Sequence, residues 1–452
     1  MGKQTYEMEK FLDENIEITI YNQDLALVKE IKELDLKIGI NTIKYTKAGA
    51  QIDPASVRVK DPEGKDQGNE RIEVLEQTYE YDLENNSKLL DRYLGKEITI
   101  TDKQGITYTG KLIRYEPGII LQKKDKCIIS FTEVSKIEFP NLEELFIKPT
   151  LVWQIQSSDS GKKDVLISYL TTGINWRAEY TLNVNANYTK ADLECWIIID
   201  NKTGVNFEGA KIKLIAGEIH RVYPVQPKGM HLRGAAEKFA SVSSDISAYD
   251  ITEENIFEYH LYSLERPIDL KNNQIKQISF FSVNSIFIEK ELVYDIWKSE
   301  KVQTIFKIEN SEEKGPGLPL PKGLVRIYKA DSEEQLQLIG EDQIEHIPKA
   351  GKIKVVAGSA FDIKVKRTQT GYERISDTIE RTSYEIALNN SKSEAQTLTI
   401  IEHLSGDWKI VKNSEPYVKT DAFTIEFKVS IPIKEKKTVT YTVENKLEKP
   451  GR

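Results

Sequence analysis

The chain of 452 residues is longer than the roughly 250–300 residues at which a single hydrophobic core stops growing, so two or three domains are expected. Its formal net charge of −8 argues against a dominant nucleic-acid-binding surface, and 39% hydrophobic residues with 30% charged residues of mixed sign exclude a disordered polyelectrolyte. The two cysteines, Cys127 and Cys195, lie far apart, which excludes a disulfide framework and predicts two buried thiols.

The first 75 residues twice show the alternation of a half-buried β-strand. Ile16, Ile18 and Ile20 alternate with polar residues, and the stretch 34–40 repeats this period of two. Residues 61–69 have the hydrophilic composition of a loop. Because so few strands do not make an independent domain, we interpret 1–75 as one part of a β-sandwich.

Residues 76–147 differ in character from the sequence on either side. Ser87 is expected to cap a short helix that ends at Gly95. Five short strands are expected to follow, at 98–100, 108–115, 119–122, 127–131 and 134–139. The turns carry Leu94-Gly95-Lys96, Gly105 and Gly110-Lys111-Leu112. With these residues the segment resembles an Sm-like or SH3-like small barrel, inserted between strands of a larger fold.

The resemblance to Sm proteins does not extend to their RNA-binding motifs. Those proteins carry an Asp and an Asn after Gly-x-Leu, and a basic residue followed by Gly in a second motif. Here Glu116-Pro117-Gly118 and Ile128-Ile129-Ser130 stand in those places. A solvated basic face is therefore expected, and RNA contact through the barrel is kept only as an alternative.

The block 148–225 is expected to complete the first sandwich. Apolar and polar residues alternate strictly from Trp176 to Asn185, and the unbroken apolar run 195–199 fits a strand covered on both faces. Alternation returns over 210–216. Three successive strands with one hydrophobic face predict the nucleus of an antiparallel sandwich.

The stretch 226–255 is small, polar and rich in Gly and Ser, which predicts a mobile linker or a helix, with a helical turn at Asp250 and Glu253. Strand-like alternation returns in 256–452, which is expected to form a C-terminal β-sandwich region. The predicted fold class is therefore mainly β, with multi-domain antiparallel β-sandwiches, an inserted Sm/SH3-like small barrel and few helices.

The sequence lacks recognisable motifs for catalysis or metal binding. Its five histidines show no H-x-H or H-E-x-x-H spacing, and Gly358-Ser359-Ala360 lacks the second glycine of a nucleophile elbow. Paired carboxylates such as Glu333-Glu334 lie in polar runs where a solvated surface is expected. We therefore predict no catalytic residue, no cofactor and no metal site.

A recurrent turn supplies the candidate interaction positions. Three turns each combine a hydroxyl residue, a glycine, an amide or acid, and an aromatic residue near a strand. Glycine permits a positive φ and the aromatic ring covers the core, so a structural turn is the first interpretation and a binding role the second. The positions are Gly173, Trp176, Arg177, Gly204, Phe207, Gly406 and Trp408.

Four blocks follow one another along the chain: YLTTGINWRAEYTL, NKTGVNFEGAKIKLIAG, VYDIWKSEKVQTIFKIENSEEKGPGLPLPKGLVRIYK and GEDQIEHIPKAGKIKVVAGSAFDIKVKR. In sequence and in order they resemble the mucoidy-inhibitor-like family, which is built around a conserved domain of unknown function. The resemblance spans nearly the whole chain outside the Sm-like segment. It implies a β-rich, multi-sandwich architecture and no established activity, so no catalytic residue is carried over.

Two main hypotheses for function follow. A non-enzymatic structural or interaction role, with a protein partner or by self-association, fits the lack of catalytic motifs. The alternative is a hydrolase for carbohydrate or peptide, with carboxylates in a cleft near Trp176 or Trp408. No run reaches the ~20 apolar residues of a transmembrane segment. The first residues lack the apolar segment of a signal peptide, which predicts a cytoplasmic protein, or an exported one whose leader has been removed.

Overall fold

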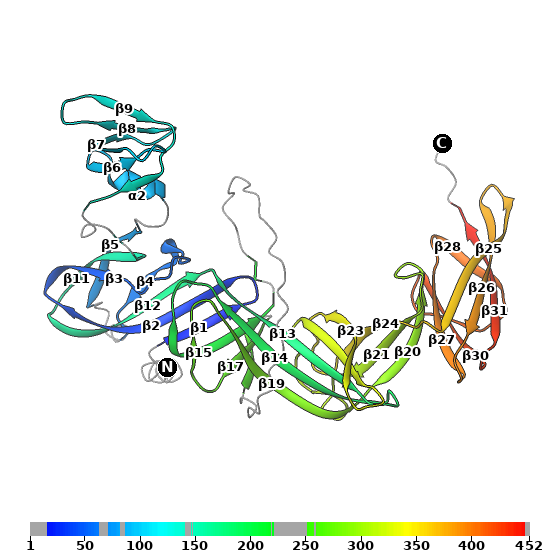
Figure 1. Ribbon diagram of the computed structural model, residues 1–452. Coiled ribbons are helices and arrows are strands. Elements are labelled where there is room, and N and C mark those ends of the chain that lie inside the picture. The colour runs from blue at the N-terminus through cyan, green and yellow to red at the C-terminus, as the bar shows by residue number, and fades with distance from the viewer. Residues whose placement is uncertain are drawn as a thin grey trace. The chain divides into compact units, whose positions relative to one another are not determined.

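The computed structural model describes residues 16–62, 71–81, 86–140, 146, 148–217, 219–220, 251–256 and 259–447. Within these residues the regular structure is almost entirely β-strand, and the mainly β fold class with several antiparallel sheets is confirmed (Figure 1). The described part holds one α-helix, α2 (Asn86–Arg92), and one short 3₁₀ helix, η1 (Pro54–Ser56). None of the described helices is long and apolar enough to cross a membrane.

The chain forms two compact units, each assembled from separate segments. Unit 1 takes 1–176, 199–215 and 261–276, and unit 2 takes 177–198, 216–260 and 277–452. The chain passes from unit 1 to unit 2 within strand β13 (Ile174–Val184) and returns within strand β14 (Lys190–Asn201). The two units therefore do not coincide with the expected segments 148–225 and 256–452, since each unit takes part of the first of them.

An eight-stranded sheet, most of whose strands belong to unit 1, gathers strands that are far apart in the sequence and is called the main sheet. Strand β1 pairs antiparallel with β2 and parallel with β15, whereas the sequence predicted that β15 would continue the antiparallel order of β13 and β14. That expectation is wrong, because the chain leaves β14 and crosses to a different sheet. The sheet order is β16 (Ile251–Ile256), β17 (Tyr259–Leu264), β15 (Phe207–Ala216), β1 (Ile16–Tyr21), β2 (Leu25–Leu36), β12 (Gly161–Thr171) and β4 (Arg58–Lys60), with β18 (Ile268–Leu270) beside β15.

A second sheet of unit 1 has the order β3 (Gly39–Tyr45), β11 (Thr150–Ser157) and β5 (Ile72–Glu80). Its aromatic side chains are buried, with Trp153 stacked on Tyr45 at 5.4 Å between ring centroids. The Tyr45 hydroxyl donates a hydrogen bond to Glu30 of the main sheet. The hydrogen bond from Tyr45 to Glu30 therefore connects the two sheets.

Glu17 on β1 is a buried carboxylate held between two lysines. Its side chain lies 3.1 Å from Lys29 Nζ on β2 and 2.9 Å from Lys213 Nζ on β15. Burial raises the pKa of Glu17, but hydrogen bonds and charges from the two lysines outweigh burial and leave the pKa below its ordinary value of 4.5. The charged form of Glu17 is therefore favoured by folding.

Acid is expected to remove this contribution to stability. Because the folded pKa is lowered, the contribution is present above about pH 4.5 and is lost as the pH falls through the folded value. Glu17→Gln should flatten the dependence of unfolding free energy on pH in this acidic range, measured by urea unfolding at several pH values. Glu33→Gln, at an exposed pair with Lys162, is the control and should leave the wild-type slope. Equal slopes for Glu17→Gln and wild type would contradict the assignment.

The segment between β5 and β11 forms a small sheet with its own core. Its order is β10 (Lys136–Glu138), β6 (Glu97–Thr101), β7 (Thr107–Arg114), β8 (Ile119–Gln122) and β9 (Ile128–Phe131). Leu90 and Tyr93 pack on buried residues of these strands. Glu80 and Thr150, which flank the segment, are register partners in β5 and β11, so the chain leaves and re-enters the sheet of β3, β11 and β5 at one point.

Two local predictions in this segment are wrong. Ser87 lies inside α2 instead of capping it, because the helix already begins at Asn86. Cys127 is exposed, because it precedes β9 in a turn, whereas Cys195 is buried in β14 as expected. The helix followed by five strands is present, with β10 and β9 at the two ends of the sheet order, and a closed Sm-like barrel stays a prediction.

The described residues of unit 2 form three sheets. Strands β13 and β22 pair in parallel in the first sheet, as do β20 and β27 in the second. Residues of the second and third sheets, such as Phe427 and Tyr441, share one hydrophobic core and form a C-terminal sandwich. The first sheet is β19 (Gln274–Phe287), β14, β13, β22 (Gly323–Ala330) and β23 (Leu336–Ile344); the second is β24 (Lys352–Ser359), β21 (Gln303–Glu309), β20 (Glu289–Asp295), β27 (Gln396–His403), β30 (Thr424–Ile431) and β29 (Tyr417–Lys419); the third is β25 (Ile363–Ser376), β26 (Ile379–Asn390), β31 (Lys436–Lys446) and β28 (Asp407–Asn413).

The predicted linker or helix at 226–255 lies largely outside the described residues. Where the structure describes it, at Ile251–Ile256, it is strand β16, so the helical turn expected at Asp250 and Glu253 is wrong. The reason is tertiary, because β17 pairs with β16 and supplies backbone hydrogen-bonding partners that outweigh the polar composition.

Candidate interaction site

The turns at Gly173 and Gly204 come together in unit 1 and are tied by backbone hydrogen bonds. Lys202 N donates to Gly173 O at 2.6 Å, Gly173 N donates to Asp24 Oδ1 at 2.9 Å, and Gly204 N donates to Asn272 Oδ1 at 3.0 Å. Gly173 has φ +78° and a Cβ there would lie 2.9 Å from Lys202 O, so a side chain is excluded. The polar groups of these turns bond within the protein, which is the arrangement of a structural turn.

The aromatic residues of the same turns are buried in unit 1. Trp176 and Phe207 are each 3% exposed, and Trp176 Nε1 donates to Ile215 O at 3.1 Å. Arg177 is exposed and pairs with Glu179 at 3.0 Å. These positions therefore present no aromatic surface to a partner.

The third turn, at Gly406 and Trp408, belongs to the C-terminal sandwich and lies at the surface. Trp408 Nε1 donates to Ala422 O at 2.8 Å, and Lys419 Nζ lies 4.4 Å from the centroid of the Trp408 ring. Trp408 therefore connects the turn after β27 to the turn before β30. These two turns border the feature of this sandwich best suited to binding.

That feature is the Trp297 cluster, which we define as Asp295, Trp297, His403 and Thr424. β20 and β27 are parallel neighbours, so Asp295 and His403 at their carboxyl ends reach the same edge of the sheet. β27 and β30 are antiparallel, with His403 and Thr424 in register. Strand pairing thus brings together residues separated by more than a hundred positions.

Asp295 shapes the turn that carries Trp297. The Asp295 side chain is buried, and its Oδ1 accepts a hydrogen bond from Trp297 N at 3.1 Å. Its carbonyl accepts from Lys298 N at 3.0 Å and Ser299 N at 2.9 Å. This is an Asx-type turn that fixes the backbone immediately before and after Trp297.

His403 is held at both ring nitrogens and supports the indole ring. Its Nε2 lies 3.1 Å from Asp295 Oδ1 and its Nδ1 lies 3.4 Å from Thr424 Oγ1. The Trp297 ring stacks on the imidazole at 4.1 Å and 19°, yet Trp297 is 73% exposed. Phe423, the residue before Thr424 in the sequence, is 55% exposed. The result is an exposed indole ring whose orientation is set before any partner arrives.

The chemistry of the cluster favours binding over catalysis. Both imidazole nitrogens already have hydrogen-bonding partners, so the ring would have to give one up to act as a base. Glu402, which precedes His403 on β27, is buried in the sandwich core, where Arg367 and Tyr441 donate hydrogen bonds to its carboxylate. Across the described ranges, no group of three or more His, Cys, Asp and Glu is placed to hold a metal ion.

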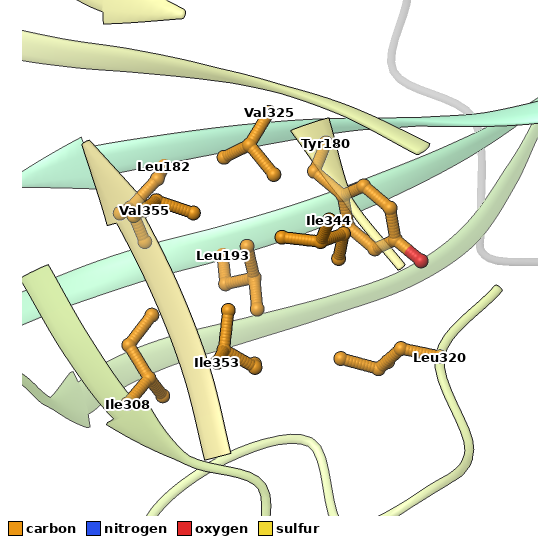
Figure 2. A pocket seen from close by; sticks show the side chains of 9 residues that line it. All are labelled: Tyr180, Leu182, Leu193, Ile308, Leu320, Val325, Ile344, Ile353 and Val355. Atoms are coloured by element: carbon orange, nitrogen blue, oxygen red, sulfur yellow. The ribbon is translucent and has the colours of Figure 1, made fainter. Parts of the chain in front are cut away.

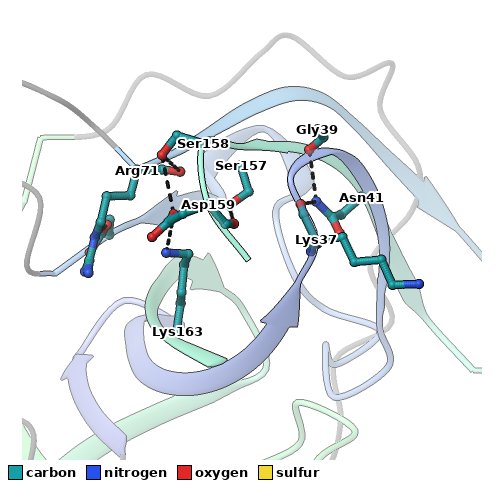
Figure 3. A network of polar contacts seen from close by, with 9 residues as sticks. Lys37, Gly39, Asn41, Arg71, Ser157, Ser158, Asp159 and Lys163 are labelled. Carbon is teal, nitrogen blue, oxygen red and sulfur yellow. Dashed lines mark hydrogen bonds and ion pairs between the residues drawn. The ribbon is translucent and has the colours of Figure 1, made fainter. Parts of the chain in front are cut away.

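A cavity and a polar network elsewhere are structural features. Figure 2 shows nine side chains of unit 2, eight aliphatic and Tyr180, around a cavity of about 10 Å³. A cavity of that volume has room for about one water molecule. Its lining offers such a water no hydrogen-bonding partner, because the Tyr180 hydroxyl donates instead to Pro321 O at 2.6 Å. The network in Figure 3 ties a turn of unit 1, where the buried Lys163 bonds to Asp159 at 2.5 Å and holds the pKa of that carboxyl below its usual value. Neither feature offers a ligand site.

Sequence reasoning selected Trp408 at the border of the cluster but missed Trp297 and His403. One local signal points to Trp297: this tryptophan follows an apolar strand and lies in a turn that begins at Asp295. Comparison of the chain with protein-family models and with curated protein sequences finds no match. The resemblance to mucoidy-inhibitor-like proteins therefore stays a prediction.

Proposed function

We propose that this is a non-enzymatic interaction protein that binds a protein partner, or a second copy of itself, through the Trp297 cluster. The observation that carries the proposal is a tryptophan 73% exposed and yet fixed by a stacked histidine. Tryptophan is enriched among the few residues that dominate binding energy at interfaces. A ring already held in place loses little conformational entropy on binding, which favours affinity. No comparable observation in the described residues supports the alternatives, a carboxylate hydrolase or RNA contact through 76–147.

Trp297→Ala is expected to weaken partner binding about 30-fold or more, the effect of losing an interface anchor worth roughly 2 kcal/mol. His403→Ala should weaken binding less, because it leaves the indole in place but frees it to rotate. Sedimentation of the purified full chain tests self-association, and affinity capture followed by titration with the captured protein tests a separate partner.

The matched control is Phe361→Ala, which removes an aromatic ring 86% exposed in the turn between β24 and β25. It should bind like wild type in both assays. If Trp297→Ala also binds like wild type, or if Phe361→Ala loses as much affinity, the Trp297 cluster is not the interaction site.

A further inference from the structure

A second cluster in unit 2 is built around Tyr188 from four separate segments. Tyr188 lies in the turn between β13 and β14, and Lys290 lies in β20. Lys329 is near the end of β22, and Lys392 is in the turn between β26 and β27. All four side chains are half-buried. The convergence of four segments makes this a defined position in the fold rather than a chance group of surface lysines.

Two of the lysines, Lys290 and Lys329, lie against the phenol ring. Lys290 Nζ lies 4.1 Å and Lys329 Nζ 4.3 Å from the ring centroid of Tyr188, and Lys329 Nζ donates to Tyr188 Oη at 2.8 Å. Phe306 stacks with the same ring at 6.1 Å and 20°. Since Tyr188 Oη accepts from Lys329, its own hydrogen remains available to donate outward.

The charges of this cluster are unbalanced. Among the described residues, none of the three lysines has a carboxylate within ion-pair distance, although Glu394 is near enough to favour the charged form of Lys290. Burial, followed by the charge of Lys392, lowers the pKa of Lys290. The hydrogen bond from Lys329, with the charges of all three lysines, lowers the pKa of Tyr188 in spite of its partial burial. The cluster therefore carries positive charge that its own side chains do not neutralise.

We propose that Lys290, Lys329 and the Tyr188 hydroxyl, in the positive field to which Lys392 adds, bind a phosphoryl group. A phosphate dianion would relieve the repulsion among the ammonium groups and accept hydrogen bonds from them and from the phenol. Compact ammonium groups suit a ligand with several equivalent oxygens, because they act as point charges without a demand for planar geometry. If the lysines served only to stabilise the Tyr188 ring, one cation–π contact would be enough, whereas two are present. The phosphoryl group can be free or carried as an ester, and the two share this chemistry.

Isothermal titration of the full chain with orthophosphate and with phosphoserine tests the proposal, in chloride buffer of matched ionic strength. Wild type should bind at least one of them saturably and more weakly as salt is raised. Lys290→Met and Lys329→Met keep most of the apolar stem over the ring but remove a charge, and each should weaken binding about tenfold or more. Tyr188→Phe removes only the hydroxyl and should weaken binding by a smaller factor. Tighter binding of phosphoserine than of orthophosphate would identify the ester-borne form.

The control is Lys412→Met, which removes an exposed lysine of β28 in the same unit and should bind like wild type. A circular-dichroism spectrum and a melting temperature like those of wild type will establish that each variant is folded. Tyr188→Phe removes a single hydroxyl group, a change too small to disturb the fold. Absence of saturable binding by wild type would overturn the proposal. So would equal affinities for wild type, Lys290→Met and Lys329→Met, or an equal loss in Lys412→Met.

Discussion

Replacing Arg367 with methionine is expected to destabilise the C-terminal sandwich. Leaving a buried charge without its partner costs roughly 3–5 kcal/mol, and we expect a value near the upper end of that range. The Arg367 guanidinium bonds to both carboxylate oxygens of Glu402 at 3.0 Å, and Tyr441 Oη donates to Glu402 Oε2 at 2.6 Å. The Glu402 side chain is 1% exposed, so water cannot replace the lost partner.

Glu402→Gln is expected to cost less than Arg367→Met. The Arg367 side chain is 22% exposed and stacks over the Tyr384 ring at 3.8 Å, so water and the ring partly stabilise its charge when the carboxylate is gone. Burial and the neighbouring carboxylate also raise the pKa of Tyr441, which therefore stays a neutral donor in the wild-type protein. The order of the two effects thus follows from which charge water can reach.

The double variant Arg367→Met/Glu402→Leu distinguishes two contributions to the unfolding free energy: the cost of leaving Glu402 charged without a partner, and the net contribution of the ion pair itself. Because a well-packed apolar replacement of a buried pair is often neutral or stabilising, the double variant should be more stable than Arg367→Met alone. Urea unfolding gives the free energies, and hydrogen exchange of 379–446 localises the change. Arg381→Met, at a half-exposed pair with Glu444 at 2.8 Å, is the control and should cost no more than about 1 kcal/mol. An Arg367→Met variant as stable as this control would contradict the prediction.

Trp176→Ala is expected to destabilise unit 1 by ~3–5 kcal/mol, the usual cost of removing a buried tryptophan. The Trp176 ring meets Tyr262 edge-on at 6.2 Å between centroids, and the indole N–H is bonded to Ile215 O. Trp176→Phe keeps much of the ring but loses the hydrogen bond, and it should cost roughly 1–3 kcal/mol.

Trp297→Ala is the matched control for Trp176→Ala, because it removes the same side chain from an exposed position. It should change the unfolding free energy by about 0.5 kcal/mol or less, whereas it should strongly affect partner binding. Urea unfolding followed by circular dichroism measures both variants. Coincident curves for Trp176→Ala and wild type would show that Trp176 does not support the core of unit 1.

The sequence determined much of the burial pattern, because a period of two assigns each side chain to a face. Alternation from Trp176 onward correctly predicted buried Trp176, Tyr180 and Leu182, and the unbroken run 195–199 is buried except at Trp196, which is half-buried. The same reasoning was wrong at Cys127, where a residue next to a strand lies in a turn and is exposed.

The choice of partner for each strand was decided only by the tertiary structure. Periodicity states which face of a strand is buried but not which backbone lies beside it, so the parallel pairs of β1 with β15 and β13 with β22 carry no local signal. The candidate binding sites depend on those pairings. Trp297 meets His403 because β20 lies parallel to β27, and Tyr188 meets Lys290 and Lys329 because β20 and β22 come together at the turn that carries it. Local sequence thus set the mainly β class and most of the core, whereas the sites arose from contacts between residues far apart in the chain, whose free energy no short stretch of sequence contains.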